Sequence, residues 1–139
     1  MERSVLIGII MFLGSFIAAA QSADDIIGTY HLPNDLDVEI YKHNNKYYGK
    51  IIALNNFENG QLKDIHNSDK TKQDEPLLGK IIIQDLVYNS LDKNWINGKM
   101  YSSEKGIVFN FKVVAINRNE IEIEGSKYFF SKTMQWNIL

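Results

Sequence analysis

The sequence predicts an all-β protein, an eight-stranded antiparallel up-and-down barrel, and three observations lead to this expectation. Apolar and polar residues alternate in short stretches after residue 25, which is the period of half-buried strands. Short turn sequences join most of these stretches to their neighbours. No stretch after residue 23 has the period expected of a helix of three turns. Strands in meander order close into a barrel because closure removes exposed edges, and a two-sheet sandwich of the same strands is the alternative.

Residues 1–20 are predicted to be a secretory signal peptide that precedes the barrel. Arg3 is followed by the apolar run 5–17 and then by three alanines that end at Ala20, which is the plan of such a peptide. The run is shorter than the roughly 20 residues of a membrane span, although an uncleaved anchor is the alternative. Cleavage after Ala20 would leave residues 21–139 as a single domain, periplasmic or secreted, without a stable membrane span.

The clearest hairpin lies at residues 38–54. Asn44-Asn45 is its turn, because asparagine tolerates the positive φ of tight hairpin turns. This register places five residues on one apolar face: Val38, Ile40, Gly49, Ile51 and Ala53. The opposite, wet face receives two cross-strand pairs, Glu39 with Lys50 and Tyr41 with Tyr48.

Two further hairpins share one strand, residues 107–116. With the preceding strand, residues 95–102, the expected inward pairs are Met100–Phe109, Gly98–Phe111 and Ile96–Val113. With the following strand the expected inward pairs are Ala115–Ile121 and Val113–Ile123, and Lys112 lies opposite Glu124 on the outer face. Both neighbours therefore predict the same inward face for the shared strand.

Three other stretches complete the predicted strands: residues 26–31, 81–88 and 128–138. The last carries an alternating face of Tyr128, Phe130, Met134, Trp136 and Ile138. Residues 55–75 are rich in Asn, Asp, Lys and Gln and predict a long solvated loop. Loops of this length are often lids or binding loops, and a tolerated surface insertion is the alternative.

Several segments occur in the order found in a known family: Gly28-Thr29-Tyr30, residues 38–51, Pro76-Leu77-Leu78-Gly79, Trp95-x-x-Gly98-Lys99-x-Tyr101 and Trp136. On these residues the chain resembles the DUF2147 family, a domain of unknown function found mostly in exported bacterial proteins. The family is related in fold to the lipocalins and other calycins. The resemblance implies export and a lipocalin-like barrel, and it carries no catalytic residues. It also implies that Tyr30 and Lys132 form a version of the aromatic and basic plug that closes one end of calycin barrels.

Composition and motifs disfavour several classes of function. The formal net charge of −2 argues against nucleic-acid binding, and the absence of cysteine excludes disulfides and thiol chemistry. His31, His43 and His66 lack the spacing of metal ligands. Glu120, Glu122 and Glu124 alternate with apolar residues and belong to a wet strand face. There is neither a Gly-x-Ser-x-Gly elbow nor a glycine-rich phosphate loop, so we predict no enzyme, cofactor or metal site.

Two hypotheses for function remain. The first is a small soluble binding protein that holds an apolar or amphipathic molecule, because Gly49, Gly98, Ala115 and Gly125 leave room on the inner face. Its candidate lining is Ile40, Ile51, Met100, Phe109, Phe111, Ile123, Met134 and Trp136. The second is an envelope interaction module with a filled barrel. It would bind an unknown protein partner through residues 55–75 and exposed Tyr41, Tyr47 and Tyr48.

Overall fold

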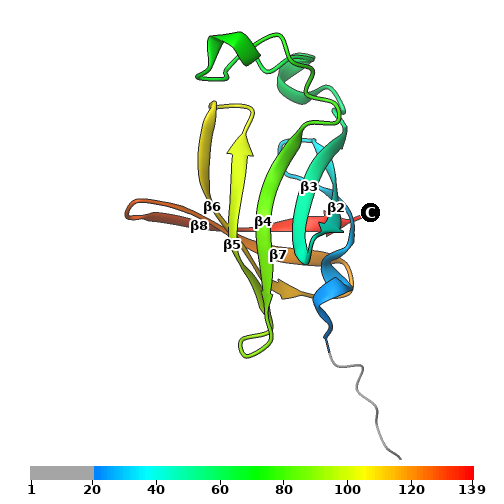
Figure 1. Cartoon of the computed structure of the whole chain (residues 1–139). Coiled ribbons are helices and arrows are strands. Elements are labelled where there is room, and N and C mark those ends of the chain that lie inside the picture. The colour runs from blue at the N-terminus through cyan, green and yellow to red at the C-terminus, as the bar shows by residue number, and fades with distance from the viewer. Residues whose placement is uncertain (1–20) are drawn as a thin grey trace, which may run out of the picture.

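The computed structural model describes residues 21–139, so the predicted signal peptide lies outside the described residues. Eight antiparallel strands form a closed barrel in sequence order (Figure 1). They are β1 (Gly28–His31), β2 (Asp37–His43), β3 (Lys46–Ala53), β4 (Ile81–Asn89), β5 (Asn94–Ser102), β6 (Ile107–Ile116), β7 (Glu120–Lys127) and β8 (Phe130–Ile138). The predicted meander barrel is thus confirmed, and the sandwich alternative is not. No helix of residues 21–139 is long and apolar enough to cross a bilayer.

The hairpin of β2 and β3 has the predicted register. Val38 lies opposite Ile51 and Ile40 lies opposite Gly49, and all four are buried. On the outer face Lys50 Nζ lies 3.5 Å from Glu39 Oε1, and the rings of Tyr41 and Tyr48 stack with centroids 6.0 Å apart. Asn44 and Asn45 both have positive φ (50° and 62°), as the tight turn requires.

One β-bulge on each side of β6 makes part of the predicted strand pairing wrong. Met100–Phe109, Gly98–Phe111 and Val113–Ile123 pair as expected. Asn97 then adopts a positive φ of 63°, the register shifts, and Trp95 rather than Ile96 lies opposite Val113. A second shift between Val113 and Ala115 leaves Ala115 exposed and opposite Glu122. A bulge inserts one extra residue into a strand, which exchanges inward and outward positions beyond it.

The N-terminal segment closes one end of the barrel. Residues Ala23–Ile26 form a short 3-10 helix, η1, so the first strand begins two residues later than predicted, at Gly28. The indole of Trp95 donates to the Ala23 carbonyl oxygen (2.9 Å), and the Tyr30 hydroxyl donates to that of Ile26 (2.7 Å). Burial raises the pKa of Tyr30 to about 12. Ile26, Tyr30 and Trp95 are buried here, so this end is filled.

The wall of the barrel is incomplete at the opposite end. The turns β1–β2, β3–β4, β5–β6 and β7–β8 gather there, as meander order requires. The seam between β1 and β8 has only two paired positions, Tyr30–Ile138 and His31–Asn137. Residues 130–135 of β8 therefore have no strand partner on that side among the described residues. Their side chains are mostly exposed, and Tyr128, predicted to be part of this strand, lies in the turn before it.

Residues 55–75 are more ordered than the predicted solvated loop. Two short 3-10 turns, η2 (Phe57–Asn59) and η3 (Lys70–Lys72), interrupt the segment, and Phe57 is buried in the core. Lys63 forms a β-bridge with Pro76, and the Leu77 amide donates to the Leu62 carbonyl (3.0 Å). Figure 1 shows the segment standing at the end of the barrel that carries the β5–β6 turn.

Candidate functional site

The open end contains a cavity of about 790 Å³. Its lining includes Leu32 and Leu36 of the β1–β2 turn, Phe109 of β6, and Met134 and Trp136 of β8. Ligand pockets of small molecules range over about 300–1,000 Å³, so its size is sufficient for one such ligand.

The structure divides the eight predicted lining residues into two groups. Met100, Phe109, Met134 and Trp136 border the cavity. The other four lie deeper, packed in the core with at most 1% of their surface exposed: Ile40, Ile51, Phe111 and Ile123. The cavity therefore lies at the barrel mouth, and the centre of the barrel is packed.

The small inward residues do not leave the expected room in the centre. A Cβ atom added at Gly49 would lie 2.7 Å from Ile83 Cδ1, and one added at Gly98 would lie 2.7 Å from Leu86 Cδ2. At Gly125 the ring of Phe109 occupies the space, 3.0 Å from such a Cβ. Interiors pack at crystal-like density, so neighbouring large side chains have filled these positions. The alternation of residues places the glycines on the inner face, but it contains no information on Ile83 and Leu86 of β4, which pack against Gly49 and Gly98.

The mouth of the cavity carries polar groups above its apolar floor. Ser103, in the β5–β6 turn, is 4% exposed, and its hydroxyl has no hydrogen-bond partner among the described residues. Lys105, Lys127 and Lys132 also border the opening, together with Glu58 and Glu104. A buried hydroxyl without a partner carries a desolvation cost, which a ligand with a polar atom at this position would relieve.

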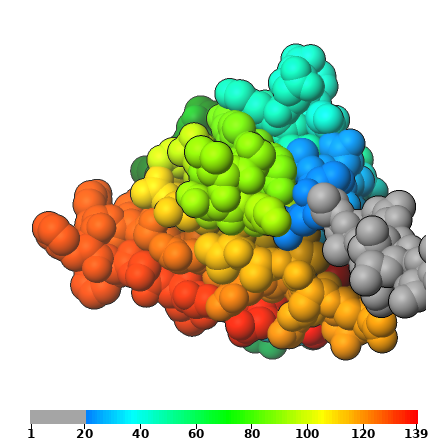
Figure 2. Space-filling view, turned by 90° about the horizontal axis from the view of Figure 1, so that it is seen from below, coloured from blue at the N-terminus to red at the C-terminus, as the bar shows by residue number. Residues whose placement is uncertain are grey.

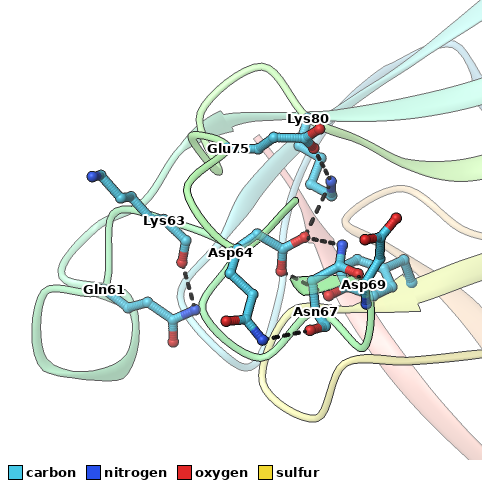
Figure 3. A network of polar contacts seen from close by, with 9 residues as sticks. Gln61, Lys63, Asp64, Asn67, Asp69, Glu75 and Lys80 are labelled. Carbon is cyan, nitrogen blue, oxygen red and sulfur yellow. Dashed lines mark hydrogen bonds and ion pairs between the residues drawn. The ribbon is translucent and has the colours of Figure 1, made fainter. Parts of the chain in front are cut away.

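A buried carboxylate anchors the loop 55–75 to the barrel beside this mouth. Asp64 is fully buried and accepts hydrogen bonds from the Tyr101 hydroxyl (2.7 Å) and from Asn67 Nδ2 (2.8 Å). Lys80 Nζ lies 3.1 Å from both Asp64 Oδ2 and Glu75 Oε2, between the two carboxylates (Figure 3). Its ammonium also lies 5.5 Å from the Tyr101 ring centroid. The anchor therefore joins the loop to β5 and to the residue before β4.

The pKa values of the anchor follow from these contacts. Burial alone would raise the pKa of Asp64, but hydrogen bonds from Tyr101, Asn67 and Lys80 outweigh it and hold the pKa below 3.8. Burial would lower the pKa of Lys80, yet its bonds to Asp64 and Glu75 raise it above 10.5. Burial and the hydrogen bond to Asp64 raise the pKa of Tyr101. The network is consequently a charged, fully paired unit at neutral pH.

The other polar residues singled out in the sequence lie away from the cavity. His31 Nδ1 lies 2.5 Å from Asp37 Oδ1, and His43 and His66 are exposed. Within residues 21–139, no cluster of histidines and carboxylates is arranged to hold a metal ion. Tyr47, expected to be exposed, is 1% exposed and donates to Asp24 (2.6 Å), because it shares the inward face of Gly49 and Ile51.

Comparison with known proteins identifies the family of this chain and a structure with a similar fold. A family profile described as "Uncharacterized protein conserved in bacteria (DUF2147)" matches residues 28–137. The chain belongs to this family. No curated protein matches the chain significantly. A solved structure reported as "Protein HP1028 from the human pathogen Helicobacter pylori belongs to the lipocalin family" is similar to it, with 24% sequence identity and a TM-score of 0.70 over 83% of each chain. This likeness shows a shared lipocalin-like fold.

Several of the residues on which the resemblance to DUF2147 rests lie at the two ends of the barrel. Tyr101 binds Asp64, and Leu77, which is fully buried, bonds to the loop backbone, so both help to hold the loop. Trp95 caps the closed end, where Tyr30 also lies. Lys132 does not join Tyr30 there: it pairs with Gly125 on the cavity side, six residues before the Ile138 that pairs with Tyr30. The expected Tyr30–Lys132 plug is therefore wrong, and Trp95 with η1 closes the end instead.

Proposed function

We propose that this DUF2147 protein is an exported, non-enzymatic binding protein that holds an amphipathic small molecule at the open end of its barrel. The observation that carries the proposal is the cavity of about 790 Å³ with an apolar floor and a polar mouth. Leu32, Leu36 and Trp136 would contact the apolar part of the ligand. The unpaired Ser103 hydroxyl and the lysines of the mouth would bind its polar head.

A fatty acid fits this arrangement in chemical class. Its chain would remove apolar lining from water, at about 25 cal/mol for each Å² of apolar surface that is buried. Its carboxylate would accept from Ser103 and lie near Lys105 or Lys132, for which no carboxylate lies within 4.0 Å among residues 21–139. The alternative of a filled interaction module has less support, because the barrel mouth is not filled.

Titration with parinaric acid, a fluorescent fatty acid, tests the proposal. Wild-type protein is expected to bind one molecule per chain. Met134→Trp should weaken binding by about tenfold or more, because the indole would occupy the cavity. Thr133→Trp is the matched control: Thr133 is the preceding residue of β8, exposed on the other face, and its variant should bind as the wild type does.

The Ser103→Ala variant distinguishes an effect on ligand binding from an effect on folding. The substitution removes a buried hydroxyl that has no partner, so the melting temperature should stay the same or rise. Affinity for the fatty acid should fall. Native mass spectrometry of protein purified from its own host would identify the natural ligand. Absence of both parinaric acid binding and a co-purifying small molecule would favour the interaction module instead.

A further inference from the structure

The tip of the β7–β8 hairpin exposes three consecutive aromatic residues. Tyr128, Phe129 and Phe130 have relative exposures of 88%, 102% and 81%. Figures 1 and 2 show this hairpin reaching out beyond the rest of the molecule. Single exposed apolar residues are ordinary on protein surfaces. A projecting cluster of adjacent rings marks an interaction site.

The two residues of this turn are an unfavourable choice if only folding is considered. Lys127 pairs with Phe130, so Tyr128 and Phe129 are the two turn residues, and Tyr128 has a φ of 55°. Glycine or asparagine normally occupies such positions, and the β2–β3 turn of this chain uses Asn44-Asn45. The two turn rings remain almost wholly in solvent, so burial does not offset the strain. A bulky residue at a turn position that favours glycine or asparagine, with no gain in packing, indicates a functional site.

Lysines lie on both sides of the rings in the sequence. Lys127 precedes them and Lys132 follows them, and Lys105 borders the cavity mouth, as do Glu58 and Glu104. Residues 125–134 contain no aspartate or glutamate. The Lys127 ammonium donates to the Val108 carbonyl (2.8 Å) and lies 5.7 Å from the Tyr128 ring centroid, close beside the tip. Aromatic rings and lysines are the residues that anchor proteins at the surface of an anionic bilayer.

We propose that the β7–β8 tip docks reversibly into the headgroup region of an anionic lipid membrane. Tyr128, Phe129 and Phe130 would enter the interface, and Lys127 and Lys132 would contact lipid phosphates. A protein partner fits this surface less well, because the cores of protein interfaces are depleted of lysine. Docking places the cavity mouth beside the lipid surface, since Lys127, Phe130 and Lys132 border both.

The absence of cysteine from the chain allows the orientation on a membrane to be measured directly. A single cysteine is introduced in the full chain by Phe129→Cys and labelled with a small environment-sensitive fluorophore. The matched control is Leu91→Cys, because Leu91 is 91% exposed in the β4–β5 turn at the other end of the barrel. Gln21 donates to the Lys93 carbonyl, so the N-terminal side of the described chain also lies at that control end.

The labelled proteins are mixed with vesicles of phosphatidylglycerol and phosphatidylcholine in equal parts. The label at 129 should shift to the blue and become protected from a water-soluble quencher. The label at 91 should not change. Vesicles of phosphatidylcholine alone, or high salt, should weaken the response at 129, because the lysines then lose their electrostatic attraction.

A double variant, Tyr128→Asn with Phe129→Gly, keeps the test independent of folding. Asn-Gly is a favoured hairpin turn, so the melting temperature should stay the same or rise. Vesicle binding through the tip, reported by a label on Ser131→Cys in both backgrounds, should fall by about tenfold or more. Protection at residue 91 instead of 129, equal binding by the double variant, or association of the tip with a second copy in sedimentation would overturn the proposal. Each result is obtained without ligand, so it is independent of fatty acid binding.

Discussion

Phe111 and Glu122 show how the position of a side chain in this barrel decides its contribution to stability. Its ring is fully buried and stacks on Trp136, with centroids 5.3 Å apart. Glu122, on the next strand, is half-buried and lies opposite Gln135 and Ala115. The first side chain supports the floor beneath the cavity, and the second faces away from the core.

Phe111→Ala should therefore lower the free energy of unfolding by about 3–5 kcal/mol, the usual cost of deleting a large buried aromatic side chain. Glu122→Ala should change it by no more than about 0.5 kcal/mol, as a surface substitution does. Chemical denaturation of the two variants checks this difference. Equal midpoints would show that the inner and outer faces have been assigned wrongly.

At the scale of elements, a buried carboxylate adds to the contacts that hold the loop 55–75 against the barrel. Asp64 connects Tyr101 of β5 and Lys80 to the loop, and Lys63 and Asp74 pair across the loop surface at 3.6 Å. Asp74 is 97% exposed, so it offers a carboxylate of the same loop without the burial. A comparison of Asp64 with Asp74 separates the effect of burying a carboxylate on stability from the effect of its charge.

Asp64→Ala should cost about 3 kcal/mol, because it leaves the Lys80 ammonium without its buried partner. Asp74→Ala should cost no more than about 0.5 kcal/mol. Hydrogen exchange should show faster exchange across residues 55–75 in the Asp64 variant, with β6 and β7 protected as in the wild type. Uniform loss of protection throughout the barrel would contradict a local anchoring role.

The lowered pKa of Asp64 also predicts how stability depends on pH. The unfolded chain binds this proton more readily than the folded chain does, so stability rises with pH in this range. The contribution of Asp64 is complete above its ordinary pKa of 3.8 and is lost as the pH falls through the lowered folded-state value. The difference in unfolding free energy between wild type and Asp64→Asn should accordingly shrink at acid pH. A difference that is independent of pH would show that Asp64 is not ionised in the fold.

At the scale of the whole molecule, the two ends of the barrel differ in structure. η1 and Trp95 close one end, while the short β1–β8 seam leaves the other open beneath the anchored loop. A cavity at one end can coexist with stability because the centre is filled by Ile83, Leu86 and Phe111.

Export is a prediction at this scale. The protein isolated from the periplasm or medium should begin at or near Gln21, because the apolar run 5–17 ends before three alanines. Cleavage there would retain Ala23 and Ile26, whose carbonyl groups cap the closed end. N-terminal sequencing checks this, and a membrane-bound protein that begins at Met1 would contradict it.

The sequence by itself determined the strand order, the main hairpin registers and the family. These depend on local information: alternation along each strand and turns such as Asn44-Asn45 set the pairing of sequence neighbours. Half of the predicted cavity lining, including Met100 and Trp136, could be assigned from the same alternation.

Tertiary structure alone decided which inward positions are open. The bulge at Asn97 exchanged Ile96 for Trp95, and Ile83 and Leu86 filled the space above Gly49 and Gly98. Asp64 became an anchor only because Tyr101 and Lys80 converge on it from elsewhere in the chain. Periodicity records the face to which a residue belongs, but packing depends on the volumes of side chains from distant strands, which no local pattern contains.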